Sequence, residues 1–109
     1  MASLVRGEEV LALLEVASDP AARLKGLLGR DGIDGALLLP NCRSVHTLGM
    51  RFSIDVAFLD RRGRVVALLT PMRRWRLGRA RWRASQVVEA EAGAFVRWQL
   101  ALGDVLEVR

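Results

Sequence analysis

The chain has 109 residues, of which 51% are hydrophobic, and a formal net charge of +5 carried by sixteen arginines and one lysine against twelve acids. This apolar content argues against global disorder, and the length suits one folded domain over residues 1–109. Because Cys42 is the only cysteine, an internal disulfide is excluded.

The start of the chain does not read as a targeting segment. "MASLVRGEEVLALLEV" places Glu8, Glu9 and Glu15 in and around its apolar run, whereas a secretory leader has an uninterrupted one. No stretch approaches the roughly 20 apolar residues of a membrane span. We therefore expect a cytoplasmic chain without a transmembrane segment.

The first expected elements are a strand and a helix. Val10–Val16 has the length of a strand; its Ala and Leu residues also permit a helix, but a helix start follows directly. Asp19 is a candidate N-cap with Pro20 at the first helical position, and Gly29 is a candidate stop. Three leucines fall on one face of this predicted helix: Leu24, Leu27 and Leu28.

Three short strands are expected next. Ala36–Leu39 reads as a buried strand that Pro40 ends or places at an edge. Ile54–Leu59 and Val65–Leu69 read as a hairpin, because Asp60–Gly63 supplies turn residues between them. Since both arms are apolar on two faces, we expect both to be central strands.

The last third begins with a loop. Pro71–Arg83 carries six arginines and two tryptophans without a regular period. A strand ending near Gly93, a helix from Ala94 that stops at Gly103, and a strand over 105–109 follow. Three apolar residues share one face of that helix: Phe95, Trp98 and Leu102.

This order of elements predicts the fold class. Helices do not alternate regularly with strands, which disfavours a doubly wound parallel sheet. We expect a mainly β or α+β fold: a compact, mostly antiparallel β-sandwich or small barrel with one or two short helices.

Several ordered motifs resemble a known family, the bacterial and archaeal domain of unknown function 192. They are "ARLKGLLGR", "TLGMRFSIDVAFLDRRGRVV", "VVEAEAG" and "LGDVL", and the resemblance covers about Val10 to Val108. It implies a mainly antiparallel β domain with a short helix after the first strand, and it implies no assigned reaction. Where many relatives carry a "WMKNT" pattern and a leader, this chain reads "HTLGMRF" and shows no leader.

Cys42, His46 and Asp55 are candidate catalytic residues. A cysteine nucleophile needs a nearby base and often a third, orienting group. In an extended strand, however, residues four apart lie about 13 Å from one another, so only a turn would join Cys42 to His46. The alternative is that Cys42 is a small buried thiol, that His46 is hydrogen-bonded to the backbone, and that Asp55 is buried and paired with Arg23, Arg51 or Thr47.

No metal site or cofactor is predicted. A structural zinc site uses four ligands of cysteine or histidine type, and the chain has two such residues. The spacing of Asp55 and Glu89 gives no evidence that they complete a set. Phosphate-binding and dinucleotide-binding glycine motifs are missing as well.

Two candidate binding surfaces remain. The first hypothesis is a small binding or accessory domain with an unidentified polar or anionic ligand or protein partner. Its candidate contacts are Arg23, His46, Thr47, Met50, Asp55 and Glu89. The second surface is Arg73–Arg83, where arginines interleaved with Trp75 and Trp82 could bind nucleic acid or an anionic membrane, or be a solvated loop. A hydrolase-like reaction at Cys42 and His46 is a further alternative.

Overall fold

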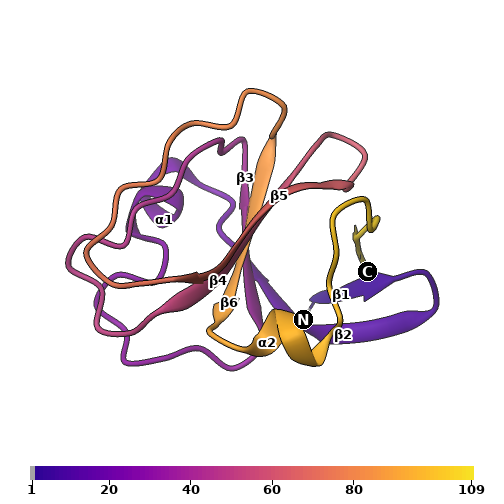
Figure 1. Ribbon diagram of the computed structural model, residues 1–109, viewed down its shortest axis with the longest axis horizontal. Helices are drawn as coiled ribbons and strands as arrows, with labels where there is room; N and C mark the ends of the chain where they lie inside the picture. Colours follow the sequence, from indigo (N-terminus) through magenta and orange to yellow (C-terminus); the bar gives the residue numbers. More distant parts are fainter. Residues whose placement is uncertain (1) are drawn as a thin grey trace.

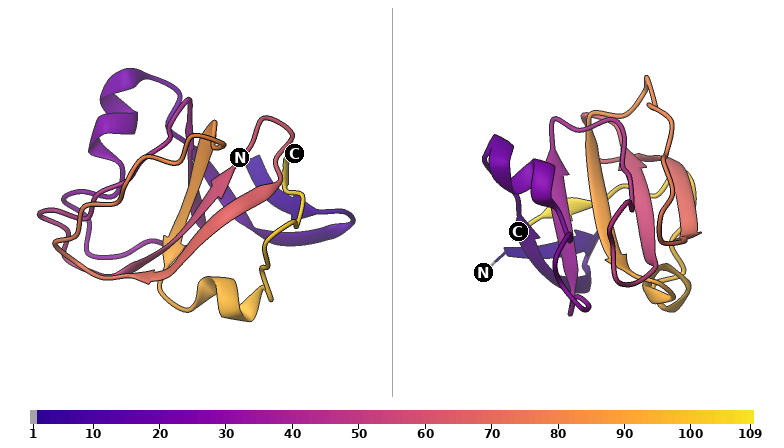
Figure 2. Two further views of the ribbon diagram at one scale, coloured as in Figure 1. Left: turned by 45° about the horizontal axis from the view of Figure 1, so that its top comes forward. Right: turned by 90° about the vertical axis from the view of Figure 1, so that its left-hand side faces the viewer.

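The computed structural model describes residues 2–109, which form one seven-stranded sheet and two short helices (Figure 1). The sheet order is β5-β4-β6-β3-β2-β1-β7, and every neighbouring pair of these strands is antiparallel except the parallel pair β2 and β3. The elements are β1 (Ala2–Arg6), β2 (Glu9–Val16), α1 (Pro20–Lys25), β3 (Ala36–Pro40), β4 (Ile54–Leu59), β5 (Val65–Met72), β6 (Gln86–Glu91), α2 (Ala94–Arg97) and β7 (Glu107–Val108). The sheet curls into a half-barrel (Figure 2), which confirms the predicted fold class.

The sheet buries apolar side chains on both faces. On β4, Ile54, Val56 and Phe58 point to one core, while Ala57 and Leu59 point to the other. The first core is covered by α1 and by long loops, and the second by α2 and the C-terminal segment. All six residues of β4 are buried, so the prediction that this strand is central is confirmed.

Helix α1 begins as the sequence predicts but ends earlier. The Asp19 carboxylate accepts a hydrogen bond from the Ala22 N–H at 2.8 Å, so Asp19 is the N-cap. The helix ends at Lys25 because Gly26 has a positive φ of 51°, and the predicted stop at Gly29 was wrong. The predicted apolar face is not formed by the helix: Leu24 is 81% exposed, whereas Leu27, beyond the helix, is buried.

Two long loops lie beside each other over the first core. Residues 41–53 and 73–84, the paired loops, are joined by backbone hydrogen bonds from Thr47 to Arg76, from Gly78 to Val45 and from Arg81 to Arg43. The N···O distances of these three hydrogen bonds are 2.8, 2.9 and 2.8 Å, in that order. His46 and Leu77 also form an isolated antiparallel β-bridge. The predicted irregular loop is confirmed from Arg73 onward.

Strand β5 differs from its prediction. It lies at one end of the sheet order with β4 as its partner, so the expectation of a central strand was wrong. It also runs on to Met72 rather than ending at Leu69. Pro71 is compatible with this position because proline has no backbone N–H, and at the free side of an edge strand no neighbouring strand would accept a hydrogen bond from it.

The segment after β6 is less helical than predicted. Helix α2 covers one turn, in which Phe95 is buried and its ring lies 5.3 Å from that of Trp98. Leu102 is 65% exposed outside the helix, so its predicted place on the helical face was wrong. Within residues 2–109, neither helix has the length and apolar character needed to cross a membrane.

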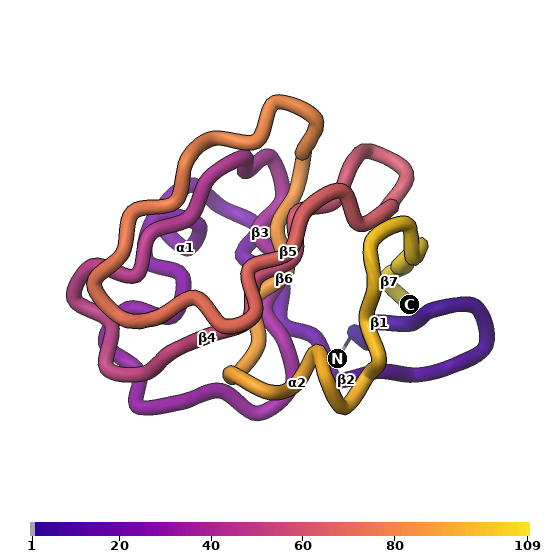
Figure 3. The backbone as a smooth tube through the Cα atoms, viewed as in Figure 1, coloured from indigo at the N-terminus to yellow at the C-terminus, as the bar shows by residue number. Residues whose placement is uncertain are grey.

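The C-terminal segment links the two ends of the curled sheet (Figure 3). The Leu106 N–H donates to the Gly63 carbonyl at 2.8 Å beside the turn between β4 and β5, and β7 then pairs with β1. A side chain at Gly63 would meet the Leu106 carbonyl, so this close approach requires glycine. Of the predicted strand over 105–109, only Glu107–Val108 is a strand.

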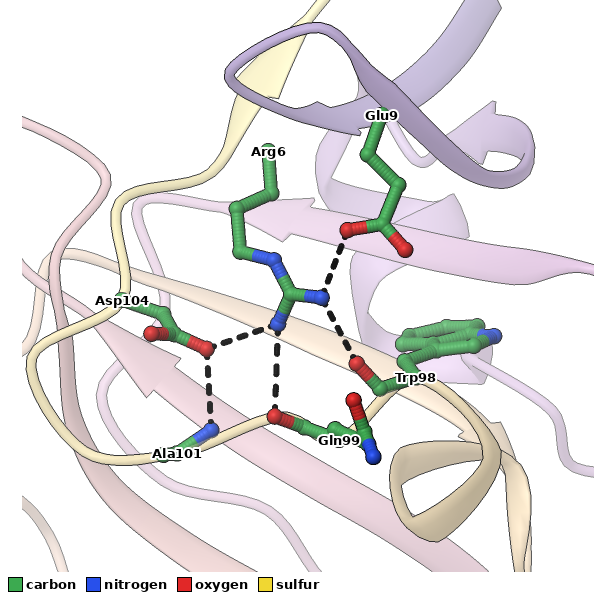
Figure 4. A network of polar contacts seen from close by, with 6 residues as sticks. All are labelled: Arg6, Glu9, Trp98, Gln99, Ala101 and Asp104. Carbon is green, nitrogen blue, oxygen red and sulfur yellow. Dashed lines mark hydrogen bonds and ion pairs between the residues drawn. The ribbon is translucent and has the colours of Figure 1, made fainter.

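Strand β1 was not predicted, and one arginine ties it to the C-terminal segment (Figure 4). The Arg6 guanidinium donates to Asp104 at 2.8 Å, to Glu9 at 2.7 Å and to the carbonyls of Trp98 and Gln99 at 2.8 and 3.3 Å. Asp104 also accepts from the Ala101 N–H at 3.0 Å. The first hairpin is thereby fixed to residues more than ninety positions away.

Candidate functional site

A pocket of about 350 Å³ lies between the end of α1, the loop after β3 and strand β6. Its walls are apolar and its polar side chains come from three separate segments. The apolar wall includes Leu24, Leu27, Leu28, Leu39, Val45 and Met50. The polar side chains are Arg23, Lys25, Asn41, Cys42, Ser44, His46 and Glu89.

Glu89 is the buried carboxylate of this pocket. It lies in the middle of β6, opposite Leu37 on β3 and Val56 on β4, and therefore faces the first core. It is 4% exposed, and its Oε1 atom has no hydrogen-bond partner in the protein. Burial raises the pKa of Glu89 to about 7, although the positive charge of Arg30 acts in the opposite direction.

The end of α1 lies against this carboxylate. A Cβ atom at Gly26 would sit 3.5 Å from Glu89 Oε1, so a glycine here keeps the helix end close to the acid without filling the space. The positive φ of Gly26 also turns the chain at this point. One residue therefore both ends the helix and shapes the pocket.

Cys42 is half-buried in the pocket wall. Its thiol donates to the Ser44 carbonyl at 3.1 Å. Burial raises the pKa of the Cys42 thiol, and the negative charge of Glu89 raises it further, while Arg23 opposes both. These surroundings favour the neutral thiol, whereas a cysteine nucleophile depends on the thiolate.

His46 is exposed at the rim of the pocket, and Met50 is buried in its wall. The Nδ1 atom of His46 accepts a hydrogen bond from the Leu48 N–H at 3.2 Å, which leaves Nε2 available to a ligand. The structure therefore brings five predicted site residues to one pocket: Arg23, Cys42, His46, Met50 and Glu89.

Asp55 lies elsewhere. It points to the same face of β4 as Ala57 and Leu59, opposite to the face of Glu89. Its Oδ2 atom accepts hydrogen bonds from the Gly93 and Phe95 N–H groups, each at 3.0 Å, so it holds the start of α2. The expected pairing with Arg23, Arg51 or Thr47 was therefore wrong.

Thr47 is buried between the paired loops, outside the pocket lining. Its hydroxyl donates to the Arg73 carbonyl and accepts from the Arg76 N–H at 2.9 Å. It thus fixes the loop that carries His46 against the loop that carries the arginines.

The arginine loop, residues 73–83, is largely exposed. Trp75 and Trp82 are 62% and 82% exposed, so they do not cap the core. Among residues 2–109, no ion pair involves an arginine of this loop. Arg81 differs from the exposed arginines of the loop because it is half-buried. Its guanidinium lies 5.3 Å from the centre of the Phe58 ring, and its buried Nε atom has no hydrogen-bond partner within residues 2–109.

Metal ligands do not cluster in the described chain. Within residues 2–109, no group of three histidine, cysteine or acidic side chains is arranged to hold a metal ion. The pocket combines one acid with cations and apolar walls, which suits hydrogen bonding and ion pairing to an organic ligand.

Comparison with known families identifies the group to which this fold belongs. The model of DUF192, described as "Uncharacterized ACR, COG1430", matches residues 3–108. The chain belongs to this family. No curated protein matches the chain.

Two solved structures share the fold of this DUF192 protein. A protein of unknown function from Novosphingobium aromaticivorans has a TM-score of 0.82 and 16% identity, covering 97% of this chain and 82% of its own. A proposed transcription regulator from Sinorhizobium meliloti has a TM-score of 0.82 and 19% identity, covering 98% and 91%. At these identities the likeness concerns the fold.

The segments that carried the DUF192 resemblance separate into two groups in space. "ARLKGLLGR", Met50 and Glu89 of "VVEAEAG" meet at the pocket, whereas Asp55 and Asp104 hold α2 and the C-terminal segment. Lys25, Asn41 and Ser44 also line the pocket but were not identified from the sequence. Lys25 could have been identified, because it follows the predicted contact Arg23 by two residues at the end of a helix.

Proposed function

We propose that this DUF192 chain acts as one small-ligand-binding domain over residues 1–109 and that its ligand occupies the Glu89 pocket. The observation that carries the proposal is the buried Oε1 of Glu89, which lacks a protein partner and lines a pocket. Buried polar atoms without partners are costly, and a ligand donor would offset that cost. Arg23, His46 and Met50 are the further proposed contacts, while Thr47 and Asp55 support the surrounding loops.

The test is to map where small polar compounds bind. We would record amide chemical shifts of the labelled protein with four chemically different compounds: L-leucine, N-acetylglucosamine, citrate and adenosine monophosphate. We expect at least one to shift the amides of Gly26, Cys42 and Glu89 in a saturable way, with those of Gly93 and Phe95 unchanged. If all four leave the pocket amides unmoved, the proposal fails.

A hydrolase-like reaction is less well supported by the geometry. Asp55 contacts the start of α2 on the opposite face of the sheet, so it does not complete a set with Cys42 and His46. The raised pKa of the Cys42 thiol also disfavours a nucleophile. Rapid labelling of Cys42 by iodoacetamide near neutral pH would revive this alternative.

The arginine loop supports a second candidate function, binding to a phosphate-rich surface of nucleic acid or membrane. The supporting observation is that its arginines are free of ion pairs within residues 2–109 and lie beside exposed tryptophans. We expect salt-dependent binding to a single-stranded oligonucleotide or to anionic vesicles that weakens when Arg73, Arg74 and Arg76 become glutamine. An unchanged affinity in that triple variant would exclude this function.

A cytoplasmic location remains a prediction.

A further inference from the structure

The charged groups of the Glu89 pocket are divided between its floor and its rim. The carboxylate that lines it is Glu89, and the Oε1 atom of this residue has no protein partner. Arg23 and Lys25 line the same pocket from the last turn of α1. Within residues 2–109, neither of these cations forms an ion pair.

From this division we propose that the pocket binds a small zwitterion, with a protonated amine at Glu89, an anionic group at Arg23 and Lys25, and an apolar side chain against the leucine-rich wall. The inference rests on the proposed function, because it names the ligand class of the same pocket. The ligand chemistry is that of an apolar α-amino acid or a compound with the same three groups.

The inner end of the pocket favours an amine. Glu89 Oε1 requires a hydrogen-bond donor, and an ammonium group donates while also neutralising the carboxylate. Arg30, whose positive charge acts on Glu89, is already held by Glu15 through two hydrogen bonds of 3.1 and 2.9 Å. A ligand amine would therefore supply the close charge partner that the protein does not provide.

The outer end explains why an amine alone is insufficient. An amine without an anion would enter past Arg23 and Lys25, which repel it, and would leave both cations unpaired. An anion without an amine would be attracted to the rim but would leave Oε1 without a donor. A zwitterion satisfies both ends, and a charge-assisted contact at each end adds to its affinity.

The wall between the two ends is apolar. Leu27, Leu39, Val45 and Met50 line it, and all four are buried members of the first core. A methionine is adaptable in shape and accommodates branched aliphatic groups. A ligand with an aliphatic side chain therefore removes more apolar surface from water than glycine would.

The test uses three probes that share one carbon skeleton. L-Leucine carries both charges, 3-methylbutylamine lacks the carboxylate, and 4-methylpentanoate lacks the amine. Titration calorimetry and amide shifts at Gly26 and Cys42 would measure binding. We expect leucine to bind roughly tenfold or more tightly than either single-charge probe, since each charge-assisted contact is worth about 1.5–3 kcal/mol.

Variants at the two ends give opposite selectivity. Glu89→Gln keeps the side-chain shape, and we expect it to weaken leucine binding about tenfold while leaving 4-methylpentanoate unchanged or tighter. The double variant Arg23→Gln/Lys25→Gln should weaken leucine binding but leave that of 3-methylbutylamine unchanged or tighter. Glu8→Gln, an exposed acid remote from the pocket lining, is the matched control and should change nothing. Unfolding curves of each variant would confirm that it folds.

The pH dependence has a defined sign. An ammonium group pairs with ionised Glu89, so leucine and 3-methylbutylamine should bind more tightly as the pH rises through 7. The charged or titratable groups around Glu89 are Arg30, Arg23, Lys25, Cys42 and His46. The Glu89→Gln variant should lose this pH dependence, which assigns it to Glu89 rather than to His46.

Two results would overturn the inference. If 4-methylpentanoate binds as tightly as leucine, and more tightly at low pH, protonated Glu89 is instead a donor to an acid. If none of the three probes shifts the pocket amides, the zwitterion is excluded. In that case a shift caused by N-acetylglucosamine, citrate or adenosine monophosphate would leave the proposed function standing, and no shift by any compound would remove both.

Discussion

Glu89 and Asp55 are buried carboxylates on adjacent strands that face opposite sides of the sheet. Asp55 accepts two backbone hydrogen bonds through Oδ2, although its Oδ1 atom has no partner within residues 2–109. Glu89 Oε1 has none, and no backbone N–H of residues 2–109 donates to this side chain. Local backbone donors therefore hold the Asp55 side chain, whereas Oε1 of Glu89 remains available to a ligand donor. Their difference is the basis of two predictions at the scale of single residues.

Glu89 should make the protein less stable as the pH rises. Its pKa is about 7 in the folded state, above the ordinary glutamate value of 4.5, so the folded state binds more protons between these values. Relative to Glu89→Gln, the free energy of unfolding should fall between about pH 4.5 and 7, by roughly 3 kcal/mol in total. Urea unfolding of both proteins at several pH values measures this, and a difference that is constant with pH would contradict it.

Asp55 should be required for stability. Asp55→Ala removes the acceptor of the Gly93 and Phe95 N–H groups, and we expect a loss of about 2–4 kcal/mol. Asp55→Asn keeps one acceptor oxygen and should cost less. The measurement is urea unfolding, with the exposed Asp34→Ala as control. Equal stabilities of the Asp55→Ala and Asp34→Ala proteins would show that these bonds contribute nothing.

At the scale of elements, the Arg6 network joins β1 and β2 to the segment after α2. Arg6→Met keeps an apolar stem but loses four hydrogen bonds, and we expect a loss of about 1–3 kcal/mol. Amide exchange should accelerate most in β1 and β7, which depend on this link. Arg61→Met, at an exposed position, is the control. Unchanged exchange in both strands would mean that the strand pairing alone holds these elements.

The sequence predicted some elements better than others. The Asp19 N-cap and strands β3, β4 and β6 were identified because a capping residue and a continuous apolar run are local signals. Helix α1 was predicted too long, because two glycines of this segment can end a helix and the sequence favoured Gly29, whereas the helix ends at Gly26, which has a positive φ. Strand β1 was missed because its five residues have too short a pattern, and its partners lie on other segments.

At the scale of the molecule, positive charge is concentrated on the paired loops. Arg43, Arg51 and the six arginines of the arginine loop carry eight positive charges, while these two segments contain no acid. The rest of the chain therefore has a net charge of −3, so the overall +5 describes one region rather than the whole surface.

This asymmetry predicts how the protein interacts with an anionic matrix. Replacing Arg73, Arg74 and Arg76 by glutamine should lower the salt concentration for elution from a cation-exchange column. The same replacement at Arg61, Arg62 and Arg64 changes the net charge equally outside the arginine loop. We expect a smaller effect there, because clustered charges act together at a surface. Equal shifts for both triple variants would contradict a concentrated charge.

The sequence by itself determined the mostly antiparallel β class, the buried strand β4, the DUF192 resemblance and the arginine-rich loop. These follow from composition, alternation and local motifs, which act over a few residues. The tertiary structure decided that β5 is an edge strand, that Asp55 and Glu89 face opposite sides, and that Glu89 meets the end of α1. Alternation shows which residues of one strand share a face of the sheet. Only the long-range pairing of β6 with β3 and β4 fixes what each face contacts.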